Sequence, residues 1–281
     1  GTLPTTMTSI GNYAFNNCVG LTGALKLTGP VTTIGTYAFR YAGITSVDIT
    51  FTTKVDNAPS LSAYTFANCA NLKTVKLAGH VDTMEYTFMK CPELESFDGT
   101  AFSVRYVTYG IFAECVKLKG TVVLNFERST SSNASMLSCY NSETTDITSS
   151  NTTSMNFKNC NQLEEVRLLG DLETISQGGD FKWCTSLKRV YFTSKLKNLG
   201  SSNRGYEFSG CTALELVDFG ENSQLERIDR YTFNGCTSLR TLNLPEGLKT
   251  IGDYCFNGCT NWVGTLPTTM TSIGNYAFNN C

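Results

Sequence analysis

Hydrophobic residues recur along this chain in a fixed order, which is clearest in the stretch that follows Cys236. Leu239, Leu242 and Leu244 have the spacing L-x-x-L-x-L, and the alternation at its end is typical of a β-strand. The Pro-Glu-Gly sequence at 245–247 and Gly252 predict two breaks in the chain direction. The apolar pattern resumes after each break, at Leu248, Ile251, Tyr254, Phe256 and Cys259. One such unit therefore predicts a strand, a corner and a short helical or 3₁₀ turn.

Equivalent units follow one another along the whole chain, and each ends on an aromatic-x-x-Cys phrase or a close variant of it. The intervals between these ends run from 21 to 27 residues, which leaves room for one strand and one return per unit. We therefore expect residues 1–281 to form a single continuous solenoid, mainly β, of about eleven and a half coils. Cysteine closes the unit at Cys18, Cys69, Cys91, Cys115, Cys139, Cys160, Cys184, Cys211, Cys236, Cys259 and Cys281, and Ala42 takes the one place where it is missing.

The first eighteen residues return unchanged at the other end of the chain, since residues 1–18 and 264–281 have the same sequence. Packing constrains only the core positions of a repeat, so identity at the Thr, Ser and Asn positions indicates duplication of a unit of 263 residues. The chain begins at Gly1 inside the pattern, without an initiator Met or a signal segment, so we expect a piece of a longer array. Open strand edges at its two ends favour head-to-tail association with itself.

The full phrase C-x-x-L-x-x-L-x-L-P-x-x-L-x-x-I-G-x-x-A-F-x-x-C resembles the BspA-like, Treponema-type leucine-rich repeat over nearly the whole chain. The resemblance implies a right-handed leucine-rich repeat solenoid with a parallel sheet on its concave side. It also implies a surface protein of the kind associated with adhesion and self-association.

The stretch 129–154 departs from the repeat, because it is rich in Ser and Thr and poor in residues that build a core. It contains the chain's two N-x-S/T sequons, at Asn133 and Asn151. We interpret it as a decorated surface segment or mobile loop, and we expect N-glycosylation at these two asparagines and an extracellular location.

The eleven cysteines that close the units, stacked coil on coil, allow two chemical states. Strands about 4.8 Å apart bring equivalent Cα atoms within the range for disulfides, yet a column of buried free thiols explains the row as well and is favoured. Cys255 replaces an alanine four residues before Cys259, which is weak evidence for a metal site and is better explained as a core substitution. His80 is the only histidine, and we expect it to lie exposed at a corner.

The charged residues of the chain bear on the kinds of partner that it can bind. With 22 basic and 24 acidic residues the net charge is −2, so neither nucleic acid nor a membrane is an expected partner, and no apolar run is long enough to span a bilayer. Basic residues gather between 184 and 210, flanked by acidic coils. Charge compensation between neighbouring coils explains this better than a binding patch.

No catalytic or phosphate-binding motif occurs, so we expect neither an enzyme nor a cofactor. The preferred interpretation is a structural or interaction protein that self-associates into a filament or surface array. The alternative is a cell-surface adhesin that binds a host protein or glycan on its concave face. Arg189 and Tyr191 are the candidate interaction residues, because aromatic and Arg side chains dominate binding hot spots.

Overall fold

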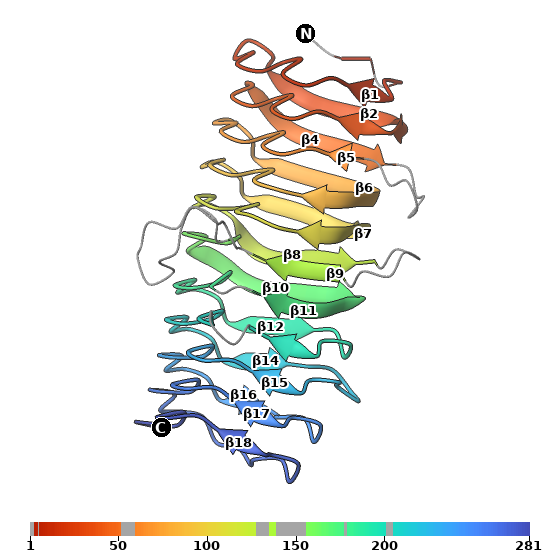
Figure 1. The fold of residues 1–281 in the computed structure, drawn as a ribbon. Coiled ribbons are helices and arrows are strands. Elements are labelled where there is room, and N and C mark those ends of the chain that lie inside the picture. Colours follow the sequence, from red (N-terminus) through yellow and green to blue (C-terminus); the bar gives the residue numbers. More distant parts are fainter. Residues whose placement is uncertain are drawn as a thin grey trace.

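The computed structural model describes residues 3–4, 6–51, 60–127, 135–138, 156–176, 179–200 and 205–281. Its strands wind into one stack of coils with the two termini at opposite ends (Figure 1). Neighbouring coils pair through parallel strands, as the period of one strand and one return per coil requires. The predicted leucine-rich repeat solenoid is therefore confirmed.

The first side of the stack is a continuous parallel ladder that carries the L-x-x-L-x-L positions. Its buried residues alternate with outward ones, as in β10, where Leu163, Val166 and Leu168 are buried and Arg167 is exposed. The strands are β2 (Gly23–Val31), β4 (Ile44–Phe51), β6 (Thr74–Met84), β7 (Ser96–Val107), β8 (Lys119–Phe126), β10 (Gln162–Gly170), β12 (Arg189–Phe192), β14 (Leu216–Asp218) and β16 (Thr241–Leu242).

The second side is built from shorter strands that precede the aromatic phrase of each coil. In the first three coils these strands form a separate three-stranded sheet, β1-β3-β5, while the remaining ones join the fifteen-stranded sheet. The long strands β6 and β7 continue from the first side into the second, where Val107 pairs with Leu137. The other strands are β1 (Ser9–Ile10), β3 (Thr33–Ile34), β5 (Ser60–Leu61), β9 (Ser135–Ser138), β11 (Leu172–Ser176), β13 (Asn198–Leu199), β15 (Arg227–Ile228), β17 (Thr250–Ile251) and β18 (Ser272–Ile273).

A column of phenylalanine rings runs through the interior from the first coil to the last. Successive ring centroids lie 4.6–5.7 Å apart, so each ring packs against the next and burial is continuous along the stack. The column consists of Phe15, Phe39, Phe66, Phe88, Phe112, Phe157, Phe181, Phe208, Phe233, Phe256 and Phe278.

The third side of each coil consists of consecutive β-turns, which corrects the prediction of short helical or 3₁₀ turns. In the coil that ends at Cys236, the N–H groups of Asn234 and Cys236 bond three residues back, to Tyr231 and Phe233. The N–H groups of Tyr231, Phe233 and Gly235 donate instead to carbonyls of the next coil, at 2.8–2.9 Å. Positive φ angles at Tyr231 (56°) and Gly235 (75°) prevent a helix, because a right-handed helix needs negative φ throughout.

The number of coils is lower than predicted, since the nine described strands of the first side make about nine complete turns, with a partial coil at each end that holds Phe15 or Phe278. The discrepancy includes the stretch between Cys115 and Cys160, where Phe157 packs directly on Phe112 at 5.5 Å and the Cys160 thiol donates to the Phe112 carbonyl at 3.1 Å. Phe112 and Phe157 therefore belong to neighbouring coils, although they are 45 residues apart in the sequence. Cys139 lies outside the described residues, and the prediction that it marks a coil of its own in the cysteine row is wrong.

Candidate interaction surfaces

The predicted interaction residues Arg189 and Tyr191 lie side by side on the outward face of β12. Their register partners on β10 are Glu165 and Arg167. The ring of Tyr191 lies under the Arg167 guanidinium, 4.5 Å from its carbon to the ring centroid. The structure thus adds two residues to the predicted pair, and we call these four residues the β10–β12 cluster. The sequence could have revealed them only through the register between strands 24 residues apart.

Glu165 holds the β10–β12 cluster together. Its side chain is buried, and the Nε atoms of Arg167 and Arg189 each donate to one of its carboxylate oxygens at 2.7 Å. Burial opposes ionisation of Glu165, but the hydrogen bonds from the two arginines outweigh it and lower its pKa. The hydrogen bond to Glu165 in turn raises the pKa of Arg189. The cluster therefore presents two fixed cations and one aromatic ring, with one of the two positive charges compensated.

An open hollow of about 570 Å³ lies on the same side of the stack, next to the β10–β12 cluster. Its wall includes Asp218, the register partner of Tyr191 on β14, and the loop acids Glu221 and Glu246. Leu216 and Leu244 give it an apolar part. The sequence analysis missed this hollow, although the chain breaks after β14 and β16 that shape it carry the Gly220 and Pro245 signals.

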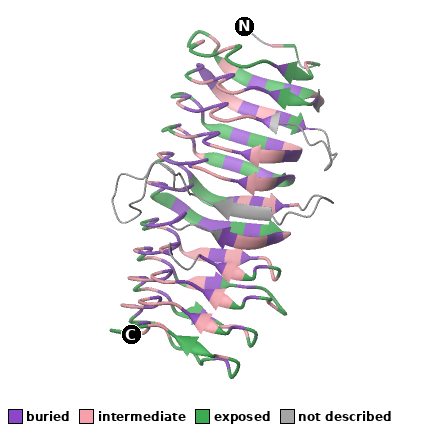
Figure 2. Cartoon of the chain, viewed as in Figure 1, coloured by how far each residue is buried: buried purple, intermediate pink, exposed green. Residues whose placement is uncertain are grey.

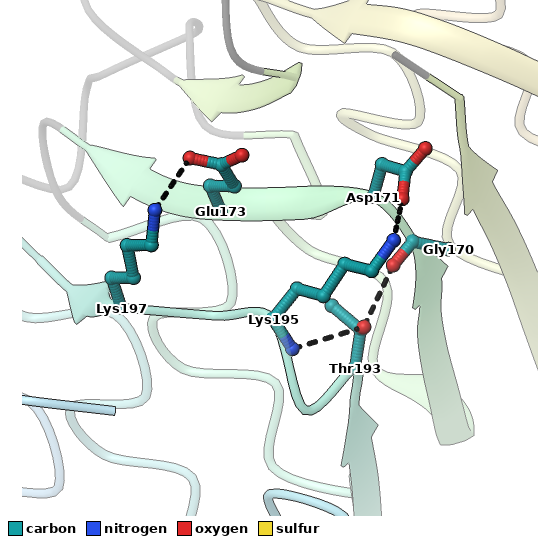
Figure 3. A network of polar contacts seen from close by, with 6 residues as sticks. All are labelled: Gly170, Asp171, Glu173, Thr193, Lys195 and Lys197. Atoms are coloured by element: carbon teal, nitrogen blue, oxygen red, sulfur yellow. Dashed lines mark hydrogen bonds and ion pairs between the residues drawn. The ribbon is translucent and has the colours of Figure 1, made fainter. Parts of the chain in front are cut away.

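The described basic residues between 184 and 210 pair with acids of the preceding coil. Lys197 lies 3.1 Å from Glu173, and Lys195 forms an ion pair with Asp171 (Figure 3). Lys188 lies 3.5 Å from Glu164. The predicted compensation of charge between neighbouring coils is thus what the geometry shows, and each exposed pair adds only about 0–1 kcal/mol.

The cysteine row is a column of thiols that donate hydrogen bonds to backbone carbonyl groups. Each thiol donates to the carbonyl of the phenylalanine in the preceding coil, at 3.0–3.4 Å for Cys69, Cys91, Cys115, Cys160, Cys184, Cys211, Cys236, Cys259 and Cys281. All eleven described cysteines are free, and Cys255 is fully buried at its alanine position. Burial raises the pKa of the Cys115 and Cys259 thiols to about 12, so these thiols stay protonated.

His80 is buried, which overturns the prediction of an exposed corner residue. Its Nδ1 lies 2.9 Å from the Ser103 hydroxyl, which donates to Glu127 at 2.6 Å. Because the serine proton goes to Glu127, Nδ1 is the protonated ring nitrogen, and the buried Nε2 has no partner among the described residues. Burial lowers the pKa of His80. This is not the arrangement of a nucleophilic triad, in which serine and carboxylate bind opposite ring nitrogens.

Some of the predicted modification and row positions fall outside the described residues. The sequons at Asn133 and Asn151, like Cys139, lie outside the described residues. Within the described part, no group of three or more His, Cys, Asp or Glu side chains is placed to hold a metal ion. The same part of the chain has no helix that is long and apolar enough to cross a membrane.

The sequence matches the family model described as "BspA type Leucine rich repeat region", in six copies over residues 1–119, 81–212 and 201–281. The structure resembles a leucine-rich repeat protein from Bacteroides ovatus ATCC 8483, with 21% identity, coverage of 100% of this chain and 70% of that one, and a TM-score of 0.60. A leucine-rich repeat protein from Eubacterium ventriosum ATCC 27560 has 18% identity, coverages of 92% and 88%, and a TM-score of 0.42. A comparison with curated protein sequences gives no match. Because the family model spans the chain from end to end, the protein belongs to the BspA-type leucine-rich repeat family.

Proposed function

We propose that this chain is part of an extracellular structural protein whose solenoids associate end to end into a filament or surface array. The observation that carries the proposal is the unchanged return of residues 1–18 as residues 264–281, because identity at positions that packing leaves free indicates that a unit of 263 residues is duplicated along one axis. Membership of the BspA-type family supports a cell-surface location.

The two copies show how one coil sequence can bind neighbours on both sides. In the first copy Ile10 is covered by the next coil and 3% exposed, whereas the equivalent Ile273 is 47% exposed. The reverse holds four residues further on, where Ala277 is 2% exposed and its equivalent Ala14 is exposed. Figure 2 shows β18 as an exposed strand at the end of the stack. The same coil sequence can therefore pack against a coil that follows it and against a coil that precedes it, as a unit within a longer stack requires.

A duplicated solenoid unit favours growth along one axis. A contact that joins one end of a solenoid to the other end of the next joins two different surfaces, so it does not close into a ring unless a rotation happens to complete one. The product of such end-to-end contacts is a fibre.

The experiment is sedimentation velocity over a wide concentration range, followed by electron microscopy of the largest species. We expect concentration-dependent linear assemblies with an axial repeat of about 45–50 Å, from about 4.8 Å per coil. A chain carrying Thr74→Asp, an exposed position of β6 whose register partners are Ser46 and Ser96, serves as the control and should assemble like the unaltered chain. A chain that stays monomeric at every concentration would exclude the filament.

The adhesin remains the second candidate function, because the β10–β12 cluster presents two arginines and an aromatic ring on the outward face of the first side. A fixed arginine pair beside an aromatic ring suits an acidic sugar or a carboxylate-bearing peptide. The double substitution Arg189→Ala with Tyr191→Ala should weaken binding to such a host protein or glycan at least tenfold, while Thr74→Ala, at an exposed position of the distant strand β6, should not. Unchanged affinity for every partner would remove this candidate site.

N-glycosylation is a third expectation of a surface protein. Material from a eukaryotic source should show hexose-rich additions at Asn133 or Asn151 by intact-mass analysis. Unmodified peptides at both positions would exclude it.

A further inference from the structure

We propose that the hollow on the first side binds an arginine side chain of an extended partner peptide. The hollow is open, is lined by β14, β16 and the loops that follow them, and has a volume of about 570 Å³. Ligand pockets of proteins typically measure about 300–1,000 Å³, so there is room for one long side chain and part of a backbone. The proposal depends neither on end-to-end association nor on the β10–β12 cluster.

The wall of the hollow carries a net negative charge. Its acids are Asp218, Glu221 and Glu246, and no basic residue lines it. None of these three carboxylates forms an ion pair with a described residue. A concave surface lined by charges of one sign concentrates ions of the opposite sign. The hollow therefore attracts a cationic group.

The uncompensated charge is a departure from the pattern of this stack. Acids at the same corner of other coils pair with a lysine of the next coil, as Glu173 does with Lys197 at 3.1 Å (Figure 3). Glu226, which follows the hollow in the same coil as β14, pairs with Lys249 at 3.2 Å. At the hollow itself the next coil supplies Glu246 instead of a lysine. The cation that neighbouring coils provide elsewhere has to come from a ligand here.

The hollow also has an apolar part that a long side chain can cover. Leu216 points outward from β14, and its register partners on the neighbouring strands are the polar residues Arg189 and Thr241. Leu244 adds a second apolar side chain to the wall. Arginine and lysine lay their aliphatic stems along apolar surface while the charged head stays in a polar place. An apolar wall beside three acids therefore suits a basic side chain.

The placement of the acids favours a wide organic cation over a metal ion. Within the described part of the chain, no three acidic, His or Cys side chains converge on one ion. One oxygen of Asp218 accepts from the Gly220 N–H at 2.8 Å, and one oxygen of Glu246 accepts from the N–H and hydroxyl of Thr268 at 3.3 and 3.2 Å. Each carboxylate is thereby oriented and keeps its second oxygen for a ligand. The planar guanidinium, with five donors, can bind separate carboxylates at once.

Two synthetic peptides test the charge that the hollow recognises. We expect acetyl-Gly-Leu-Arg-Leu-Gly-amide to bind the chain in isothermal titration calorimetry, with an affinity that falls as salt is added. Citrulline has nearly the shape of arginine but no charge, so the peptide with citrulline in its place should bind at least about tenfold more weakly. Equal affinities for the two peptides, or no binding of the arginine peptide, would overturn the proposal.

Amide substitutions in the wall locate the binding site. Glu221→Gln combined with Glu246→Gln should weaken binding of the arginine peptide at least about tenfold, because it removes two of the three charges. Glu93→Gln combined with Glu226→Gln is the matched control, since it removes the same charge from two acids that pair with lysines outside the hollow. The control should change the affinity less than about twofold. An equal loss in both variants would mean that the peptide responds to overall charge, and the hollow would be refuted.

The β10–β12 cluster supplies the comparison with the other proposals. The chain with Arg189→Ala and Tyr191→Ala keeps the acids of the hollow, so it should bind the arginine peptide at least as tightly as the unaltered chain. Weaker binding by that chain would place the peptide on the cluster and refute the hollow. A chain that binds the peptide but never assembles would refute only the filament, and one that assembles without binding the peptide would refute only the hollow.

Discussion

At the scale of single residues, the cysteine row shows what spacing can and cannot predict. Each cysteine ends an equivalent phrase, so the sequence is sufficient to place these side chains in one column. Spacing does not decide between thiols and disulfides, because both tolerate the same distance between Cα atoms. The structure supplies the missing fact, since each thiol faces a carbonyl of the preceding coil, as Cys211 faces Phe181 at 3.0 Å. A thiol that donates to this carbonyl cannot at the same time be bridged.

Alkylation of the native protein should therefore label few of its twelve cysteines. Thiolates are the reactive species, and burial raises the pKa of the thiols in the middle of the row. Among the described cysteines, the exposed Cys281 and the partly exposed Cys18 should react first. Denaturation without reductant should bring labelling close to twelve. Recovery of ten or more cysteines as disulfides would contradict the hydrogen-bonded row.

His80 illustrates where reasoning within one repeat fails. Its position after a strand and a glycine predicts an exposed corner, yet Ser103 and Glu127 of the two following coils cover it. Those contacts depend on which polar residues occupy equivalent places in other coils, and the pattern of a single coil does not contain that information.

The buried imidazole should make the stability of the protein depend on pH. Burial lowers the pKa of folded His80 below its ordinary value of 6.5, although Glu127 and Asp82 oppose the shift. The unfolded chain therefore binds a proton first as the pH falls, and the free energy of unfolding decreases below about pH 6.5. Urea unfolding between pH 8 and pH 5 should show a smaller loss for His80→Gln than for the unaltered chain. Equal losses in the two proteins would assign the pH dependence to other groups.

At the scale of elements, the strands were predictable and the turns were not. Alternating apolar residues and the Pro and Gly breaks locate the two strand sides, because burial on one face requires period two. The third side carries apolar residues at Tyr254, Phe256 and Cys259, whose steps of two and three residues fit a helical turn and a chain of β-turns alike. The positive φ at the tyrosine decides between them, and tyrosine is not a residue from which a left-handed conformation can be predicted.

Substitutions at Tyr231 should reveal this backbone conformation. Its ring stacks on Tyr206 and Tyr254 with centroids 4.5 and 4.9 Å away, so both Tyr231→Ala and Tyr231→Gly lose aromatic contacts. Glycine adopts the left-handed conformation without strain, whereas alanine retains a cost of about 1 kcal/mol. Tyr231→Gly should therefore be the more stable variant by about 1 kcal/mol in urea unfolding.

A strand position supplies the control for Tyr231. Thr241 is exposed in β16, where an extended backbone gives glycine no advantage, so Thr241→Ala should be more stable than Thr241→Gly. The same order at both positions would contradict the role assigned to the left-handed tyrosine.

At the scale of the whole molecule, the predicted number of coils was too high, because the stretch between Cys115 and Cys160 has the spacing of two repeats. Cys139 falls 24 residues after Cys115 and 21 before Cys160, which fits the period. The stacking of Phe157 on Phe112 shows that the period is a coincidence there. Core residues are scarce in the stretch 129–154, and that scarcity was the better signal, because a coil without buried apolar side chains cannot hold its place in the stack.

Removal of residues 139–153 should therefore leave the solenoid intact. Leu137 of β9 precedes Cys160 by 23 positions, whereas Ile251 of β17 precedes Cys259 by 8, so the deletion restores the ordinary distance between the second side and the cysteine row. The shorter connection between β9 and Cys160 should stabilise the fold by about 1 kcal/mol or less, since the entropy of closing a connection depends only weakly on its length. Circular dichroism should show the secondary structure of this deletion variant, and thermal unfolding its stability.

Deletion of the same number of residues over 212–226 serves as the control. It removes Leu214, Val217, Phe219 and Leu225 from the core, so that variant should lose cooperative unfolding. A similar loss in the 139–153 deletion would mean that this stretch is a coil after all.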